Sequence, residues 1–104
     1  LKILRRARAW DIWLHLRDYT SRHVVIFRNK TTRVTAAKIR EVGEWMLREH
    51  FGAKADQHKG EKFELMVAEC RHVRPIKGDR VGRVTYTDAS TYVLRMPPKV
   101  RSAD

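Results

Sequence analysis

Cysteine is nearly absent from this sequence of 104 residues, since Cys70 is the only one and no internal disulfide can form. Five glycines and three prolines are too few for a collagen-like or low-complexity chain. No apolar run approaches the roughly 18 residues of a membrane-spanning helix, and no segment has the pattern of a secretory signal. These absences exclude disulfide-stapled, fibrous and membrane-spanning classes, and one free cysteine favours a reducing compartment.

Acidic residues are also scarce. The chain has 12 Asp and Glu against 23 Lys and Arg, which gives a net charge of +11 and an isoelectric point near 10.5. A folded domain with this excess predicts an acidic partner, of which nucleic acid is the commonest and an anionic membrane the next. The alternative interpretation is that the charge only keeps a small domain soluble. Hydrophobic residues make up 42% of the chain, enough for one core.

The hydrophobic pattern predicts one α/β (α+β) domain over residues 1–104, with a single mixed sheet of about four to five strands and helices packed on it. Because the chain begins at Leu1, we expect it to be part of a longer polypeptide. The expected elements are the end of a basic helix (1–9), strands at 11–17 and 23–27, a helix at 34–51, a strand at 63–68, an exposed basic segment at 71–83, a hairpin of 84–87 with 90–96, and a tail at 97–104.

Two of these expectations concern packing. The run from His23 to Phe27 is continuously apolar and predicts a central strand that is buried on both faces. For the helix, we expect Thr31 or Thr32 to cap its start and Gly52 to end it. Its buried stripe is expected to include Ala36, Ile39, Val42 or Gly43, Met46 and Leu47.

Catalytic and metal-binding patterns are missing from the sequence. Cys70 and His72 could supply two metal ligands, but no second ligand pair follows at zinc-like spacing. The same two residues lack an orienting acid for nucleophilic catalysis, and the glycines at 78 and 82 do not form a phosphate loop. We therefore expect no enzyme activity, no metal and no cofactor.

The positive signals indicate binding. Cations that could neutralise RNA phosphates gather at the two basic segments, namely Arg5, Arg6, Arg8, Arg71, Arg74, Lys77, Arg80 and Arg83. Trp13 lies on the strand face opposite Ile12 and Leu14 and is a candidate anchor for a partner protein. The alternatives are that Trp10, Trp13 and Trp45 close the rim of the core, or that aromatic side chains among the cations stack on RNA bases.

Four segments carry a resemblance to a known family. Residues 9–17 (AWDIWLHLR) are followed by Thr20-Ser21, and residues 23–27 form the next strand. Thr31-Thr32-Arg33 precedes the helix, and residues 82–96 have the length and polarity of a closing hairpin. In this order the segments resemble the ribosomal silencing factor (Iojap-like) family, whereas residues 54–70 look like an insertion. The resemblance implies a factor that binds the large ribosomal subunit, in subunit assembly or in blocking premature subunit joining.

The same resemblance implies the partners and the compartment. It implies contact with a ribosomal protein at the subunit interface, through Trp13, Tyr92 and Asp88, and with rRNA, together with other assembly factors and no membrane. The basic charge departs from the acidic bacterial members and favours an organellar form in the mitochondrial matrix, with the cytoplasm as the alternative. The alternative function is a constitutive basic protein of the large subunit, of the exit-tunnel type, because the Thr-initiated helix and the basic glycine-bearing loop also resemble that protein.

Overall fold

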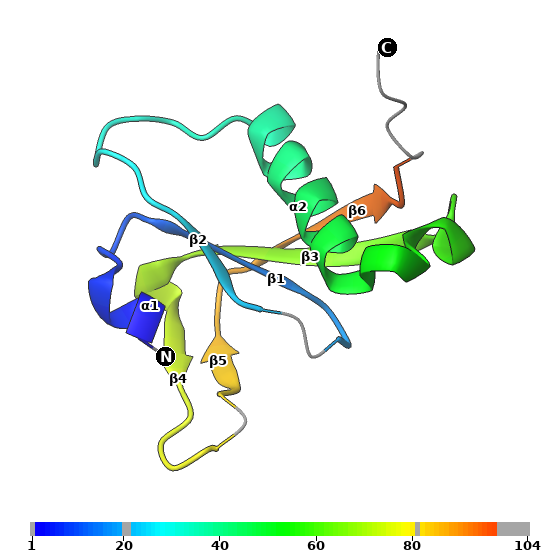
Figure 1. Cartoon of the computed structure of the whole chain (residues 1–104). Helices are drawn as coiled ribbons and strands as arrows, with labels where there is room; N and C mark the ends of the chain where they lie inside the picture. The colour runs from blue at the N-terminus through cyan, green and yellow to red at the C-terminus, as the bar shows by residue number, and fades with distance from the viewer. Residues whose placement is uncertain (1, 20–21, 81, 98–104) are drawn as a thin grey trace.

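The fold is taken from a computed structural model, which describes residues 2–19, 22–80 and 82–97. Of the predicted tail, residues 98–104 lie outside the described part. The elements run in the order α1 (Lys2–Arg6), β1 (Ile12–Leu16), β2 (Val24–Ile26), α2 (Ala36–Phe51), the 3-10 helix η1 (Gly52–His58), β3 (Lys62–Glu69), the 3-10 helix η2 (Cys70–His72), β4 (Val73–Pro75), β5 (Val84–Tyr86) and β6 (Ser90–Arg95) (Figure 1).

The predicted fold class is confirmed, since helices pack on a main sheet of four strands in the order β2-β1-β3-β6. The single mixed sheet that the sequence predicts is instead a main sheet whose pairings are all antiparallel, with β4 and β5 in a second, two-stranded sheet. The prediction of a central strand at 23–27 is wrong, because β2 is short and lies at the edge. Residues 54–70, which look like an insertion in the sequence, contain all of β3, the strand between β1 and β6, so they form a central part of the main sheet.

The predicted hairpin of residues 84–87 and 90–96 is likewise wrong. β5 pairs with β4, whereas β6 pairs with β3 from Val67↔Ser90 to Lys62↔Arg95. The backbone N–H of Thr87 still donates to the carbonyl of His72 at 3.0 Å, so the chain leaves the small sheet only after this residue. Asp88 then takes a positive φ of 52°, which turns the chain toward the main sheet.

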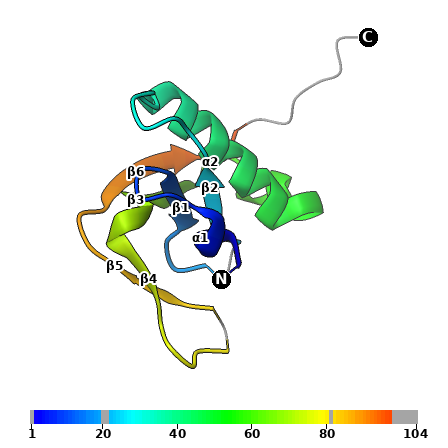
Figure 2. The same ribbon diagram turned by 90° about the vertical axis from the view of Figure 1, so that its left-hand side faces the viewer.

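Helix α2 covers one face of the main sheet, as Figure 2 shows. Its N-cap is Thr35, whose side chain accepts from the N–H of Lys38, and not Thr31 or Thr32 as predicted. The buried residues of α2 are Ile39, Gly43, Met46 and Leu47, which confirms the stripe except for Ala36, which is exposed.

Gly43 lets α2 approach the sheet closely. A Cβ atom at this position would lie 2.5 Å from Leu94 Cδ1 and 2.9 Å from Leu65 Cδ2. Gly52 ends the helix as predicted, with a φ of 52° and its N–H bonded to the carbonyl of Arg48. The main core therefore lies between α2 and the residues of β1, β3 and β6 that face it.

The opposite face of the sheet carries a second, smaller core. Trp13, Val25, Met66, Ala68, Cys70 and Val73 are buried there, and residues of α1 pack against them. The β4–β5 ribbon projects from this side of the sheet, away from α2 (Figure 1).

Trp13 Nε1 donates to Nδ1 of His23 at 3.0 Å, and Nε2 of His23 lies 3.1 Å from the carbonyl of Gly82. Since Nδ1 accepts, Nε2 carries the proton and donates to Gly82, which ties the ribbon to the sheet.

Candidate nucleic-acid interface

Three grooves meet where α1 leads into β1. The first, of about 480 Å³, lies between α1 and the η2–β4 segment and is lined by four arginines, Arg5, Arg8, Arg71 and Arg74. The second, of about 800 Å³, lies between the end of α1 and residues 26–38, and its cations are Arg6, Arg8, Arg28, Arg33 and Lys38. The third, of about 380 Å³, contains Trp10, Arg28, Lys30 and Arg71.

These grooves form one surface. Arg8 lines the first and second grooves, Arg28 the second and third, and Arg71 the first and third. We call the three grooves together the junction surface. Within the described residues, its lining contains nine cations and only two acids, Asp11 and Glu69.

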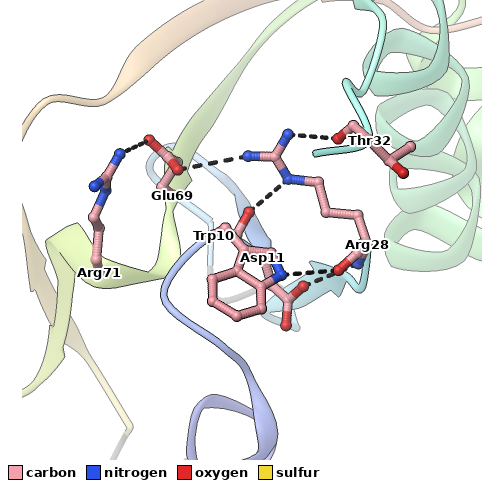
Figure 3. A network of polar contacts seen from close by, with 6 residues as sticks. All are labelled: Trp10, Asp11, Arg28, Thr32, Glu69 and Arg71. Carbon is pink, nitrogen blue, oxygen red and sulfur yellow. Dashed lines mark hydrogen bonds and ion pairs between the residues drawn. The ribbon is translucent and has the colours of Figure 1, made fainter. Parts of the chain in front are cut away.

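Both acids already have partners within the protein. Asp11 is 1% exposed, and its carboxylate accepts from the backbone N–H groups of Arg8, at 2.7 Å, and Arg28, at 2.9 Å. One carboxylate oxygen of Glu69 contacts Arg71 at 2.7 Å and the other contacts Arg28 at 3.5 Å (Figure 3). The hydrogen bond from Arg71 is the main cause that lowers the pKa of Glu69. The acids therefore organise the surface and leave its positive charge in excess.

Arg28 fixes the shape of the junction. Its Nε donates to the carbonyl of Trp10 at 2.6 Å, and one of its terminal nitrogens donates to the carbonyl of Thr32 at 2.8 Å (Figure 3). The indole N–H of Trp10 donates in return to the carbonyl of Arg28 at 3.0 Å. These bonds join the start of β1, the end of β2 and the following loop, so the grooves do not need to be assembled when a ligand binds.

The structure divides the predicted rRNA contacts into two groups. Arg5, Arg6, Arg8, Arg71 and Arg74 line the junction surface although their two segments are far apart in the sequence. The other three residues, Lys77, Arg80 and Arg83, lie on the exposed connection between β4 and β5 and line none of the three grooves. Arg83 Nε donates to the Asp79 carboxylate at 2.6 Å, and this ion pair joins the two sides of the connection between β4 and β5.

Sequence reasoning missed four cations of the junction surface: Arg28, Lys30, Arg33 and Lys38. The available signal was the loop at 28–33, which holds three cations and no acid. This loop faces α1 only because β2 runs antiparallel to β1 and ends beside the start of that strand, with Ile26 opposite Ile12. The register of this strand pair is set by the folded structure and could not be predicted from the sequence of the loop alone.

The predicted protein interface is not assembled. Trp13 is 1% exposed, so its indole is not available to a partner, and it lies inside the second core and not at the rim of a core. Tyr92 packs on the main core on the other side of the sheet, with the Arg40 guanidinium 5.3 Å from its ring centroid. Asp88 is exposed and its carboxylate lies 3.6 Å from Nδ1 of His72. Trp13 and Tyr92 cannot share one surface, because β-sheet residues on opposite faces are separated by the sheet.

Cys70 is a buried thiol. Burial, with a contribution from the charge of Asp11, raises the pKa of Cys70 to about 11, so the thiol stays protonated and unreactive near neutral pH. Within residues 2–19, 22–80 and 82–97, no three His, Cys, Asp or Glu side chains group as a metal site would require. No helix in this part of the chain is long and apolar enough to cross a membrane.

Comparison with known proteins gives a likeness of fold alone. No family model and no curated protein matches the chain. A solved structure, that of the C-terminal part of the fibronectin/fibrinogen-binding protein from Streptococcus suis, superposes with a TM-score of 0.68 at 21% sequence identity. The match covers 91% of this chain and 35% of the other, so the chain spans about a third of that protein's structure. At this identity the likeness establishes that this architecture occurs in a known protein.

Proposed function

We propose that the chain is a non-catalytic RNA-binding domain whose junction surface binds phosphates of the large-subunit rRNA. The observation that carries the proposal is the charge balance of that surface. Nine cations line three connected grooves, and the two acids in the described lining are already bonded to the protein. A polyanion with regularly spaced charges is the partner that this arrangement fits best.

The chemistry of the side chains supports phosphate contact over base reading. Seven of the nine cations are arginines, whose planar guanidinium groups form paired hydrogen bonds with phosphate oxygens. Such contacts position a protein on RNA without specifying its sequence. We therefore expect strong, salt-dependent binding with little sequence preference.

The ribosomal part of the proposal rests on the resemblance to the silencing-factor family. As such a factor, in the mitochondrial matrix, the domain would act sterically by covering a surface that the small subunit needs. Because Trp13 is buried, we place the contact with the ribosome at the junction surface and not at the β1 face. The constitutive ribosomal protein remains the second candidate, since it requires the same small, basic, non-catalytic domain.

Co-sedimentation with purified ribosomal subunits tests the proposal. We expect the chain to sediment with large subunits in 50 mM salt and to dissociate as the salt is raised, because counterions compete for the phosphates. Absence of binding to large subunits at 50 mM salt would contradict the proposal. Gradient fractionation of cell extracts, with quantitative mass spectrometry, separates the two ribosomal functions: a factor is enriched in free large subunits, whereas a constitutive protein is equally abundant in polysomes.

A further inference from the structure

We propose that Trp10 is a stacking platform for an unpaired RNA base, so that the junction surface binds single-stranded RNA in preference to a duplex. The inference rests on the proposed function and adds a ligand class to it. Trp10 lines the third groove together with Arg28, Lys30 and Arg71, so one wall of this basic groove is an indole.

The indole is held in position before any ligand binds. Its N–H donates to the carbonyl of Arg28, and the carbonyl of Trp10 itself accepts from the Arg28 side chain (Figure 3). These bonds use the edge of the ring and the backbone. No hydrogen bond uses the ring face, and the fixed position of the indole limits the entropy lost when a base stacks on it.

Two cations lie over this ring, and a stacking base takes the place of at least one of them. The Arg8 guanidinium lies 5.7 Å and the Lys30 ammonium 5.8 Å from the ring centroid. Glu69 is the only acid among the described residues of this groove, and both of its carboxylate oxygens have arginine partners. An aromatic ring within a positive groove is the arrangement that proteins use for single-stranded nucleic acid, because a base can stack while its neighbouring phosphates meet the cations.

The neighbouring groove supplies places for the flanking phosphates. Arg71 lines both this groove and the first groove, where Arg5, Arg8 and Arg74 follow. A strand with one base on Trp10 can therefore continue along α1. In a duplex the base faces are stacked within the helix and cannot reach the indole, so only the phosphate contacts remain.

Trp45 offers a matched control. It is 50% exposed on α2 and lines a different groove, whose charged residues are Arg22 and Glu49. This tryptophan is thus more exposed than Trp10, yet its groove carries no excess of positive charge among its acidic and basic side chains. A stacking effect confined to Trp10 would depend on the junction surface and not on the mere presence of an indole.

The test compares three fluorescein-labelled probes of equal length: a uridine 12-mer, an abasic 12-mer with the same phosphates, and a 12-base-pair RNA duplex. We expect Trp10→Leu to weaken binding of the uridine 12-mer by about fivefold to a hundredfold, the range for loss of one stacked base. The same variant should bind the abasic 12-mer and the duplex like the wild type, and Trp45→Leu should bind all three probes like the wild type. Thermal unfolding of each variant checks that it is folded.

Three results would overturn the inference: wild-type binding of the uridine 12-mer by Trp10→Leu, an equal loss on the uridine and abasic probes, or an equal loss on the duplex. If Trp10→Leu fails to fold, tryptophan emission from the Trp45→Phe protein decides instead. The buried Trp13 contributes the same emission with either probe, whereas a stacked uridine quenches Trp10 and the abasic probe does not. Equal emission with both probes at saturation would then contradict stacking. Failure of the wild type to bind any probe at 50 mM salt would reject the proposed function itself.

Discussion

The two faces of the main sheet differ in what their side chains do. Toward α2, the buried residues are aliphatic, aromatic or methionine, with Leu14, Leu16 and Leu65 fully buried. On the other face, the smaller core includes Trp13 and Cys70, and polar groups such as His23 hydrogen-bond at its edge. The first basic groove lies on this second side, between α1 and the η2–β4 segment, whereas the second groove extends from Arg6 to Thr35 and Lys38 at the start of α2. The comparison indicates that the α2 face supplies stability, whereas the candidate site lies where α1, the start of β1 and the loop before α2 come together.

The largest expected effect is the loss of an apolar side chain on the α2 face. Ile39 is 6% exposed in the main core, so Ile39→Ala should lower the free energy of unfolding by about 2–5 kcal/mol through lost burial and a cavity. Denaturant titration measures this change, and Arg48→Ala, at an exposed position of the same helix, should alter stability by no more than about 0.5 kcal/mol. An unchanged unfolding midpoint for Ile39→Ala would show that this face does not dominate stability.

A smaller loss of stability is expected at the α1 junction. Asp11→Asn replaces one carboxylate oxygen, which accepts from a backbone N–H, by an amide group that cannot accept. Because the site is buried, the free energy of unfolding should fall by about 1–3 kcal/mol. Glu69→Gln is the control in the same network, and its side chain is 29% exposed, so it should cost less. A larger cost for Glu69→Gln than for Asp11→Asn would contradict the central position of Asp11.

The smallest expected effect concerns pH and the second core. Burial is the main cause that lowers the pKa of His23, and the neighbouring charge of His15 adds to it. In the unfolded chain His23 takes up a proton near its ordinary pKa of 6.5, whereas the folded protein does so only at lower pH. The stabilisation is therefore complete above pH 6.5 and is lost as the pH falls through the pKa of the folded state.

Thermal unfolding between pH 7.5 and pH 5 measures this dependence. We expect His23→Gln to unfold with a weaker dependence on pH than the wild type over this range, and His50→Gln, at an exposed position of α2, to keep the wild-type dependence. Identical profiles for His23→Gln and the wild type would show that His23 does not link the ribbon to the sheet in a protonation-dependent way.

The sequence predicted the elements better than their pairing. The period of the apolar residues identifies β1, α2 and β3, because one face of each element must be buried. The period of the apolar residues does not identify the partner strand of β5, because short strands of similar composition leave several antiparallel pairings open. The apolar run at 23–27 was misread for a related reason: Val25 faces the second core, whereas Val24 and Ile26 pack on the first.

The candidate site was predictable only in part. The basic residues of α1 and of the η2–β4 segment stand out in the sequence as runs almost free of acid. That they lie side by side follows from β1 pairing with β3, where Ile12 lies opposite Glu69. The backbone N–H of Cys70 then donates to the carbonyl of Asp11, and that of Arg71 to the carbonyl of Ala9. Such long-range contacts carry no local sequence signal.

The most direct test of the junction surface is the salt dependence of RNA binding in two variants of equal charge. One variant replaces Arg5, Arg8 and Arg74 by Gln. The other replaces Arg48, Lys54 and Lys59 by Gln, and these three residues are exposed and line none of the three grooves. Each variant lowers the net charge from +11 to +8, since three cations are removed. For the uridine 12-mer, log affinity decreases with log salt. We expect this dependence to become less steep by about 2 in the first variant, at roughly 0.7 per lost phosphate contact, and to stay unchanged in the second. Equal slopes in the two variants would contradict a localised site and would assign the binding to net charge alone.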